Sequence, residues 1–432
     1  MAEEACDVLV IGGGPGGSTV ATLLARQGLG VVQLEKARHP RFHIGESLLP
    51  MNLPVLERLG VLEQVRALAV FKPGADFEAD NDRGYRTYAF DRALGTSPPH
   101  AFQVWRADFD RLLFEHARAA GVDGREGVEA LAFQHRGPRD HVVDLRDADG
   151  HCRRIRARYL VDASGRDTFL ARRKKIARRN PQHQSAAIFG HFRGAAAREG
   201  SDAGNISIYN FEHGWMWMIP LPDGVMSVGA VCRPDYLKTR RGRPQADFLL
   251  ETLRMNPALW SRMGAARLID DTVHVTGNYS YSAKRIGGPG WLLVGDAFAF
   301  LDPVFSSGVF LAMSGAEQAA ELVVAALADP AAEARLQRRL QTRLRAGMRR
   351  MGYFIYRFNS PVMRHLFRWP SNVWQVEQGV ISMLAGDVFD SRRVWWRLQF
   401  FRLIYTVRAL YDWRCWHAER RYRLAQAKTE FT

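Results

Sequence analysis

The segment Gly12-Gly13-Gly14-Pro15-Gly16-Gly17 has the glycine spacing of a pyrophosphate-binding turn. The first glycine of such a segment permits a tight turn, the second admits a phosphate close to the backbone, and the third lets a helix pack on a strand. Glu35 follows about 20 residues later, where a carboxylate can accept both hydroxyls of a ribose. We therefore predict that Gly12, Gly14, Gly17 and Glu35 bind a dinucleotide.

The elements around these glycines have the order that such a site needs. Residues 7–11 form a β-branched run, residues 18–26 carry apolar side chains at helical spacing, and residues 31–34 form a second short apolar run that Glu35 closes. This pattern predicts a strand–helix–strand unit with the glycines at its first turn. The N-terminal amides of the helix then face the phosphates.

Three further segments favour FAD as the dinucleotide. Residues 291–294 predict a strand that ends at Gly295-Asp296, and in flavoproteins of this fold a late Gly-Asp pair returns to the ribityl and pyrophosphate groups. A helix cap is the alternative role for Asp296. Arg106 resembles an arginine that contacts FAD in the same families, with a plain surface arginine as the alternative. Residues 162–166 (DASGR) resemble a motif near the cofactor but depart from the Asp-Gly pair of NADPH-dependent aromatic hydroxylases.

The segment Gly214-Trp215-Met216-Trp217-Met218-Ile219-Pro220 distinguishes among the families of flavin-binding proteins. As a strand it would place the tryptophans and Ile219 on one face and both methionines on the other. A WxWxIP segment after an amino-terminal GxGxxG resembles the flavin-dependent halogenases. The resemblance covers roughly residues 5–325 and includes Gly45-Glu46-Ser47, followed by Lys72 in the setting where halogenases carry a single active-site lysine.

The resemblance implies a reaction and further site residues. In the family, reduced FAD and O2 form a flavin hydroperoxide, halide attacks it to give hypohalous acid, and the lysine directs this species; we assign that role to Lys72. A lysine in a partly dry tunnel can have a lowered pKa, which makes it a better nucleophile. The amides near Ser307 and Gly308 would hold the halide at a helix start, where a simple helix cap is the alternative. Phe305 stands where tryptophan halogenases carry a catalytic glutamate, which argues against free tryptophan as the substrate.

Composition sets the class of protein. The 432 residues are 47% hydrophobic and predict a folded protein with a large core. The four cysteines, Cys6, Cys152, Cys232 and Cys415, form no CxxC pair, so we expect neither a metal site nor a disulfide framework. The first residues do not resemble a signal peptide and no stretch of about 18 uncharged apolar residues occurs, which predicts a cytoplasmic protein without a membrane-spanning helix.

The fold class implied is α/β: a Rossmann-type FAD-binding domain of the single-component aromatic hydroxylase kind, with a mixed-sheet substrate lobe and a helical C-terminal extension. We expect the FAD-binding core in residues 1–185, with inserted substrate-lobe strands near residues 71–105. After this segment we expect the lobe that carries WxWxIP in residues 186–285 and a return to the core in residues 286–328. We expect a basic, aromatic-rich helical lid in residues 329–432.

The net charge of +15 is concentrated at the C-terminus, where residues 331–432 hold 20 Lys and Arg against seven Asp and Glu. A lid with a basic outer face is the favoured interpretation. Docking of an acidic acyl carrier protein and peripheral contact with an anionic membrane at its inner face are the alternatives. No recognition motif supports nucleic acid as a partner.

The resulting hypothesis is an FADH2-dependent halogenase that installs bromide or chloride on an electron-rich aromatic or polyene substrate, free or carrier-tethered. A separate flavin reductase would supply FADH2, because the sequence has no second nucleotide fingerprint. The alternatives are an FAD-dependent monooxygenase or a geranylgeranyl-type reductase of the same fold. A flavin-binding scaffold without turnover is a further alternative.

Overall fold

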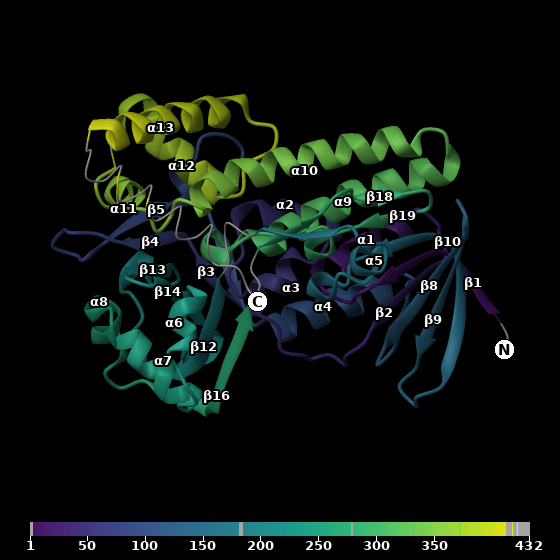
Figure 1. The fold of residues 1–432 in the computed structure, drawn as a ribbon, viewed down its shortest axis with the longest axis horizontal. Helices are drawn as coiled ribbons and strands as arrows, with labels where there is room; N and C mark the ends of the chain where they lie inside the picture. Colours follow the sequence, from purple (N-terminus) through teal and green to yellow (C-terminus); the bar gives the residue numbers. More distant parts are fainter. Residues whose placement is uncertain are drawn as a thin grey trace.

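The computed structural model describes residues 3–180, 185–277, 280–370, 372–411, 417 and 421. Figure 1 shows an α/β part on the right, a second sheet at the lower left, and C-terminal helices along the upper left. This arrangement confirms the predicted α/β class with a mixed sheet and a helical extension.

The α/β part is built on parallel strands in the order β19-β10-β1-β2-β7. Their bounds are β1 (Glu3–Ile11), β2 (Val31–Glu35), β7 (Asp123–Glu126), β10 (Cys152–Asp162) and β19 (Trp291–Leu293). The antiparallel strands β8 (Glu129–Gly137), β9 (Asp140–Arg146) and β18 (Gly287–Gly288) complete this sheet. Val8, Leu9 and Val10 are fully buried, as expected of a parallel strand covered on both faces. Helix α1 (Pro15–Ala25) connects β1 to β2, which confirms the predicted strand–helix–strand unit.

Helix α9 (Ser307–Ala328) packs against α1 and α10 (Glu333–Ile355), while α4 (Arg106–Ala119) packs on the other side of α1. By length and composition alone, α9 is apolar enough to cross a membrane, which differs from the expectation that no such helix exists. Its apolar residues are explained by burial, because Val309, Met313 and Val323 lie inside the core. A long apolar helix packed within a protein is typical of a core helix.

The second sheet has seven strands in the order β16-β12-β15-β14-β13-β4-β5. Their bounds are β4 (Gly74–Glu78), β5 (Tyr85–Ala89), β12 (Ala186–Arg193), β13 (Ile206–Phe211), β14 (Gly214–Leu221), β15 (Val225–Cys232) and β16 (Arg267–Gly277). Strand β14 is buried along its whole length, and its two faces belong to different cores. Trp215 and Trp217 share a core with the C-terminal helices, whereas Met216 and Met218 pack with α7 (Gln245–Arg254) and α8 (Pro257–Trp260). The predicted alternation along WxWxIP is therefore confirmed.

Smaller elements join these parts. A two-stranded sheet pairs β3 (Ala69–Lys72) with β6 (Ala101–Val104), and a three-stranded sheet contains β11 (Ala177–Arg179), β17 (Tyr281–Ala283) and β20 (Ala299–Phe300). The short helices are α2 (Leu53–Leu59), α3 (Leu62–Ala67), α5 (Phe169–Arg173) and α6 (Pro234–Lys238).

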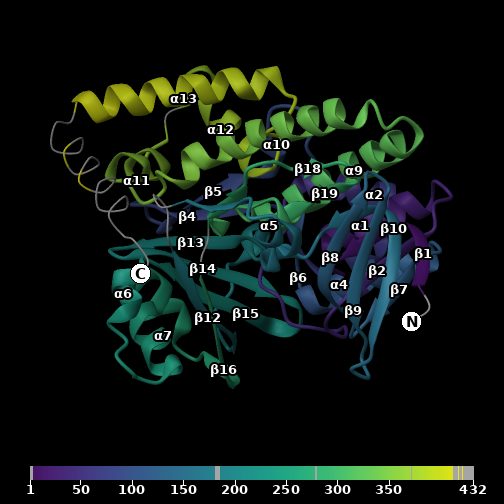
Figure 2. The same cartoon turned by 45° about the vertical axis from the view of Figure 1, so that its right-hand side comes forward.

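The C-terminal helices cover the tryptophan-bearing face of the seven-stranded sheet. They are α10, α11 (Pro361–Arg368), α12 (Val376–Leu384) and α13 (Arg392–Tyr411), and Figure 2 shows α13 as the outermost of them. Phe367 of α11 lies near the rings of Phe77 and Tyr88 on the sheet, with centroids 5.0 Å and 5.6 Å away. The buried carboxylate of Glu377 on α12 accepts hydrogen bonds from Arg86 and Arg92, which ties the helices to the β5 region.

Phe367→Ala is expected to lower the free energy of unfolding by about 3–5 kcal/mol, because it leaves a cavity between sheet and helices. The side chain is only 4% exposed, and urea denaturation followed by near-ultraviolet circular dichroism measures the loss. Leu403→Ala is the control: this side chain is 56% exposed on the neighbouring helix α13, so its effect should stay within about 0.5 kcal/mol. Equal losses in both variants would contradict the packing described.

Candidate active site

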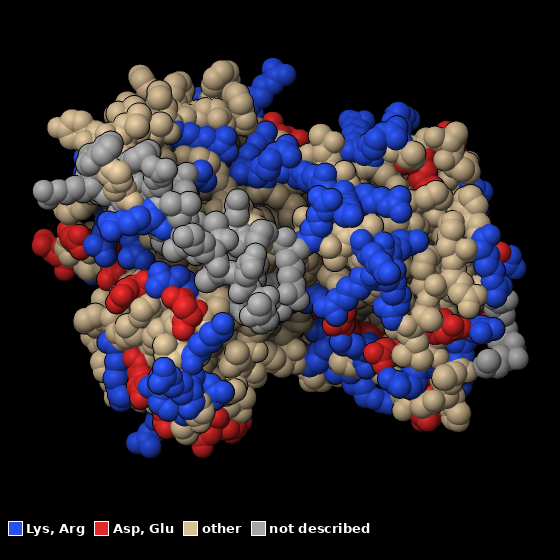
Figure 3. Space-filling model, in the orientation of Figure 1, with Lys and Arg blue, Asp and Glu red and all other residues tan. Residues whose placement is uncertain are grey.

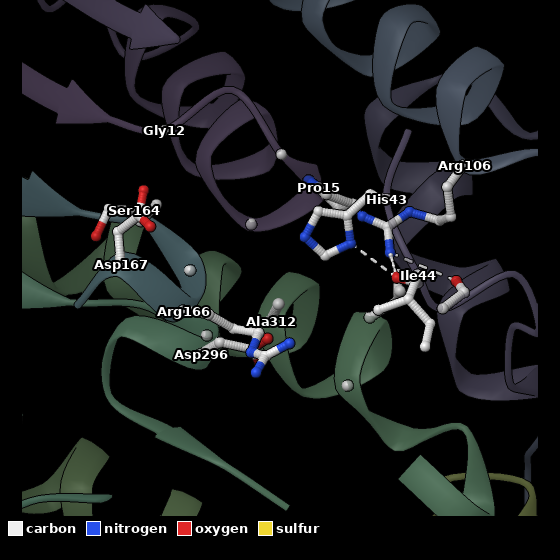
Figure 4. Close-up of a pocket in the computed structure, with 18 of the residues that line it drawn as sticks. Gly12, Pro15, His43, Ile44, Arg106, Ser164, Arg166, Asp167, Asp296 and Ala312 are labelled. Atoms are coloured by element: carbon white, nitrogen blue, oxygen red, sulfur yellow. Dashed lines mark hydrogen bonds between the residues drawn. The ribbon is translucent and has the colours of Figure 1, made fainter. Parts of the chain in front are cut away.

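A cavity of about 680 Å³ lies at the carboxyl ends of the parallel strands, beside the tryptophan face of the second sheet. Most of the residues predicted to bind the cofactor line it, and Figure 4 shows several of them facing the same space. The predicted residues on its wall are Gly12, Gly14, Glu35, Arg106, Asp296 and Gly308. Parallel sheets bind ligands at this end of their strands.

Two glycines of the turn, Gly12 and Gly17, lie too close to neighbouring backbone to carry a side chain. Gly12 has a φ of +114°, and a Cβ added there would lie 2.2 Å from the carbonyl oxygen of Ala163. A Cβ on Gly17 would lie 2.0 Å from the carbonyl oxygen of Gly12, so this glycine permits close packing of α1 on the turn. Gly14 is the N-cap of α1, and a Cβ there would meet only Arg41, at 3.6 Å. The N-terminus of α1 is thus open to an anionic group.

Glu35 ends β2 and is held by three donors. Its carboxylate accepts hydrogen bonds from the backbone N–H of Gly13 at 2.9 Å, the backbone N–H of Ala37 at 3.0 Å and the guanidinium of Arg41 at 3.1 Å. Arg41 also donates to Asp110 at 3.1 Å and lines the cavity. The sequence contains no signal for Arg41, because its second partner, Asp110, lies 69 residues away in the chain.

Arg106 stands at the first turn of α4, where it is bound from two sides. Its Nε and Nη2 donate to Asp110 at 2.8 Å and 3.0 Å, and its Nη1 donates to the carbonyl of Ile44 at 2.6 Å (Figure 4). Asp110 is fully buried; burial alone would raise the pKa of this carboxyl, but Arg106 and Arg41 outweigh that effect and hold it below its usual value. Asp110 positions Arg106 on the cavity wall, and the four-residue spacing on one helix was the available signal for this pair.

Asp296 follows β19 and has an unsatisfied carboxyl group. It lines the cavity, accepts no hydrogen bond from a residue that the structure describes, and lies beside Arg166 in Figure 4. Burial raises the pKa of Asp296 to about 7, with Arg166 and Arg106 opposing the shift. Asp296 is partly exposed toward the cavity, so its carboxyl is available to a ligand hydroxyl. Together with the open glycine turn and Glu35, it fits the hydroxyls and pyrophosphate of FAD.

The start of α9 meets the cavity at Ser306 and Gly308, while the side chain of Ser307 is buried and lies off the wall. Ser306 adopts a left-handed backbone conformation with a φ of 56° and is the N-cap of this helix of 22 residues. The first backbone N–H groups of a helix have no partner within the helix, so this end of α9 can accept an anion.

Lys72 is placed behind the cavity wall. Its Nζ donates to the hydroxyl of Ser47 and to the carbonyl of Leu48, both at 2.8 Å, and Ser47 lines the cavity. The side chain is 1% exposed and forms no ion pair with a carboxylate of the described residues. Burial therefore lowers the pKa of Lys72 to about 7.

The two tryptophans form the cavity wall nearest the second sheet. The indole of Trp215 donates to Asp302 at 3.2 Å, and that of Trp217 donates to Ser227 at 3.2 Å, so both rings are fixed. Asp302 also accepts from Ser185 at 2.8 Å. Phe305 is buried against Phe358 and Phe367 and contributes no polar group to the site.

A second polar pair borders the cavity. Glu46, which lines it, contacts His191 with 2.6 Å between Oε1 and Nε2. The rings of Phe42 and His274 stack nearby, with 3.8 Å between centroids. The sequence offered no signal for this pair beyond the GES segment, because His191 lies on β12, far along the chain.

Comparison with known proteins assigns the family. A sequence profile described as an FAD binding domain matches residues 5–351. The flavin-dependent halogenase armH3 of Armillaria mellea is 34% identical over 346 residues, which cover 74% of this chain and 68% of that protein. The chain belongs to the flavin-dependent halogenase family. It is an enzyme of the FAD-dependent oxidoreductase type.

Other halogenases resemble the chain over different lengths. Tryptophan 2-halogenase of Chondromyces crocatus is 35% identical over 328 residues, which cover 74% of this chain but only 61% of that protein. The chain is 28% identical to a 1H-pyrrole-2-carbonyl-[peptidyl-carrier protein] chlorinase of Pseudomonas fluorescens over 420 residues, covering 91% of the chain and 92% of the relative.

Solved structures share the fold over nearly the whole chain. The flavin-dependent brominase Bmp2 superposes with a TM-score of 0.80 at 26% identity, covering 92% of this chain and 99% of that one. A Cytophaga hutchinsonii protein described as a flavoprotein/dehydrogenase superposes with a TM-score of 0.86 at 26% identity, covering 95% of this chain and all of the other.

Gly12→Ala of the halogenase is expected to raise the dissociation constant for FAD by about tenfold or more, because strain of about 1–3 kcal/mol must move the turn. Fluorescence titration with FAD measures the change. Gly28→Asn is the matched control, since Gly28 also has a positive φ, +78°, but has no atom within 4 Å of an added Cβ. Unchanged affinity in Gly12→Ala would show that the turn does not contact the cofactor.

Proposed function

We propose that this halogenase uses FADH2, O2 and bromide or chloride to halogenate an electron-rich aromatic or polyene substrate, with Lys72 directing the oxidised halogen. The observation that carries the proposal is the buried amine of Lys72, held at 2.8 Å from Ser47 directly behind the FAD cavity. Reduced FAD, when bound, supplies the oxygen activation that converts halide to hypohalous acid.

The environment of Lys72 suits an amine that must react rather than pair with a carboxylate. With a pKa of about 7, a large fraction of Lys72 is neutral at physiological pH, and a neutral amine has a free electron pair. Such an amine can hold hypohalous acid by a hydrogen bond, or react with it to form a haloamine and water. Trp215 and Trp217 lie on the cavity wall, where they would keep an organic substrate from reaching the flavin directly.

The N–H groups at the start of α9, near Ser307 and Gly308, are the proposed halide site. Ser306 and Gly308 reach the cavity wall there, and a helix N-terminus favours an anion. Halide would thus lie beside the cofactor and on the same side as the tryptophans.

We infer that the substrate is a pyrrole, a phenol or a carrier-tethered acyl group rather than free tryptophan. The ring of Phe305 is buried against Phe358 and Phe367, at the position where tryptophan halogenases place a carboxylate. A relative named as acting on a pyrrole bound to a peptidyl carrier protein matches nearly the whole chain and supports a carrier as a partner. A separate flavin reductase is proposed as the source of FADH2.

Lys72→Met is expected to lower the yield of halogenated product by about a hundredfold, the lower end of what a positioned proton-transfer group contributes. Purified protein is incubated with FAD, NADH, an unrelated flavin reductase, O2 and bromide, with phenols, pyrroles and a carrier-bound pyrrole as traps. Mass spectrometry detects the bromine isotope doublet. Lys284→Met, at an exposed position, is the control and should keep the full yield. An equal doublet in both variants would mean that free hypobromite causes the halogenation.

The same assay tests a second candidate function. The similarity to a protein described as a flavoprotein/dehydrogenase favours an FAD-dependent monooxygenase or reductase as the alternative. A product with an added oxygen or added hydrogens, formed equally by wild type and Lys72→Met, would support that alternative. Rapid reduction of the bound FAD by NADPH without the reductase would contradict the proposed need for a partner enzyme.

The pKa of Lys72 also predicts a pH dependence of stability. The amine has a pKa of about 7 when folded and 10.5 when exposed, so between these values the unfolded state binds more protons. The free energy of unfolding of the wild type, relative to Lys72→Met, should therefore rise with pH by up to about 1.4 kcal/mol per pH unit in that interval. Urea denaturation of both proteins at about pH 7 and about pH 9 measures it. A constant difference would mean that Lys72 keeps an ordinary pKa.

A further inference from the structure

Helix α13 has two apolar faces. Val394, Leu398, Phe401, Tyr405 and Ala409 are buried in the core formed with the sheet and the other C-terminal helices. The opposite face carries Trp396, Phe400, Leu403, Val407 and Leu410, which follow one another at steps of four, three, four and three residues. At about 100° per residue, these five side chains form one stripe about 20 Å long.

This stripe is exposed to solvent. Trp396, Leu403, Val407 and Leu410 are 54–65% exposed, and Figures 1 and 2 show α13 along the outer edge of the molecule. Trp374, in the turn before α12, is 63% exposed and packs on Phe400 with ring centroids 4.9 Å apart. We use the term outer apolar face for the side chains of Val373, Trp374, Trp396, Phe400, Leu403, Val407 and Leu410. Among the described residues, eight of the 12 exposed large hydrophobic side chains lie between residues 369 and 411, which marks this face as an interaction surface.

Arginines border the outer apolar face. Helix α13 contains Arg392, Arg393, Arg397, Arg402 and Arg408 and no acidic residue. The angular step of the helix places Arg393, Arg397 and Arg408 on one side of the stripe and Arg402 on the other. Figure 3 shows the surface at the upper left, where α13 lies, as mainly tan, with blue side chains along its lower edge.

The positive charge of α13 indicates which kind of partner can bind there. Two copies of this helix would bring arginines against arginines with no acidic residue of α13 to pair with them, which opposes self-association. An anionic partner is favoured instead. A straight apolar stripe with tryptophans and bordering arginines matches a planar interface, where aromatic rings lie at headgroup level and arginines extend to phosphates.

We propose that the outer apolar face docks the enzyme on an anionic lipid bilayer. Trp374, Trp396 and Leu403 enter the headgroup region, and the arginines of α13 contact lipid phosphates. The enzyme then lies on the membrane surface without a helix crossing it. This surface is separate from the FAD cavity, so the proposal does not depend on the reaction.

The test is co-sedimentation of the full-length protein with vesicles. Wild type should bind phosphatidylcholine vesicles that contain about one third phosphatidylglycerol, and high salt or pure phosphatidylcholine should weaken binding about tenfold or more. Trp396→Glu/Leu403→Glu/Val407→Glu should abolish binding, and Arg392→Gln/Arg393→Gln should weaken it about fivefold for each arginine. Because all these side chains are exposed, FAD affinity and thermal midpoint should stay at wild-type values.

Met255→Glu/Val275→Glu is the matched control. These side chains are 42% and 53% exposed on the sheet lobe, so acidic replacements there should leave vesicle binding unchanged. Absence of binding to anionic vesicles would overturn the proposal. In that case, a wild-type dimer that the triple variant disperses would identify a second copy of the chain as the partner. Binding of an acidic carrier protein to this face would identify a carrier protein as the partner.

Discussion

Strand β14 is buried on both faces, and the placement of the site depends on this constraint. Because its side chains alternate between two cores, a shift of one residue would exchange tryptophans for methionines along the cavity. The hydrogen bond from Trp215 to Asp302 then fixes the sheet to the loop that precedes α9. The flavin cavity, the start of α9 and the tryptophan face are thereby held in one arrangement.

Desolvation dominates the environment of two groups of the site, Lys72 and Asp296. Lys72 and Asp296 both have pKa values near 7, although one is lowered and the other raised. The cause is the same, because desolvation favours the neutral form of each group. Each group can therefore exchange a proton near neutral pH, which an ion-paired lysine or an exposed aspartate could not do.

Around Glu35, by contrast, the charged groups of the site are paired with one another. Glu35, Arg41, Asp110 and Arg106 form a chain of ion pairs in which each charge has a partner. Paired charges on rigid elements orient hydrogen-bonding groups and keep their protonation constant. The site thus combines a charged, fixed region around Glu35 with a dry, uncharged region around Lys72.

The sequence alone determined the elements whose signals are local. The glycine turn, the strand–helix–strand order and the alternation along WxWxIP each depend on residues close in the chain, and a resemblance carried on those motifs identified the family. The same resemblance singled out Lys72, Arg106 and Asp296 by the sequence motifs around them. These features could be predicted because periodicity and turn chemistry act over a few residues.

Only the tertiary structure decided what depends on distant contacts. It placed Lys72 behind Ser47 rather than on the cavity wall, and left Ser307 buried and off that wall. It brought Arg41 to Asp110, Glu46 to His191, and left one apolar face of α13 uncovered. Burial, and with it the shift of each pKa, is set by residues from several elements that meet only in the folded chain, so no local pattern could reveal it.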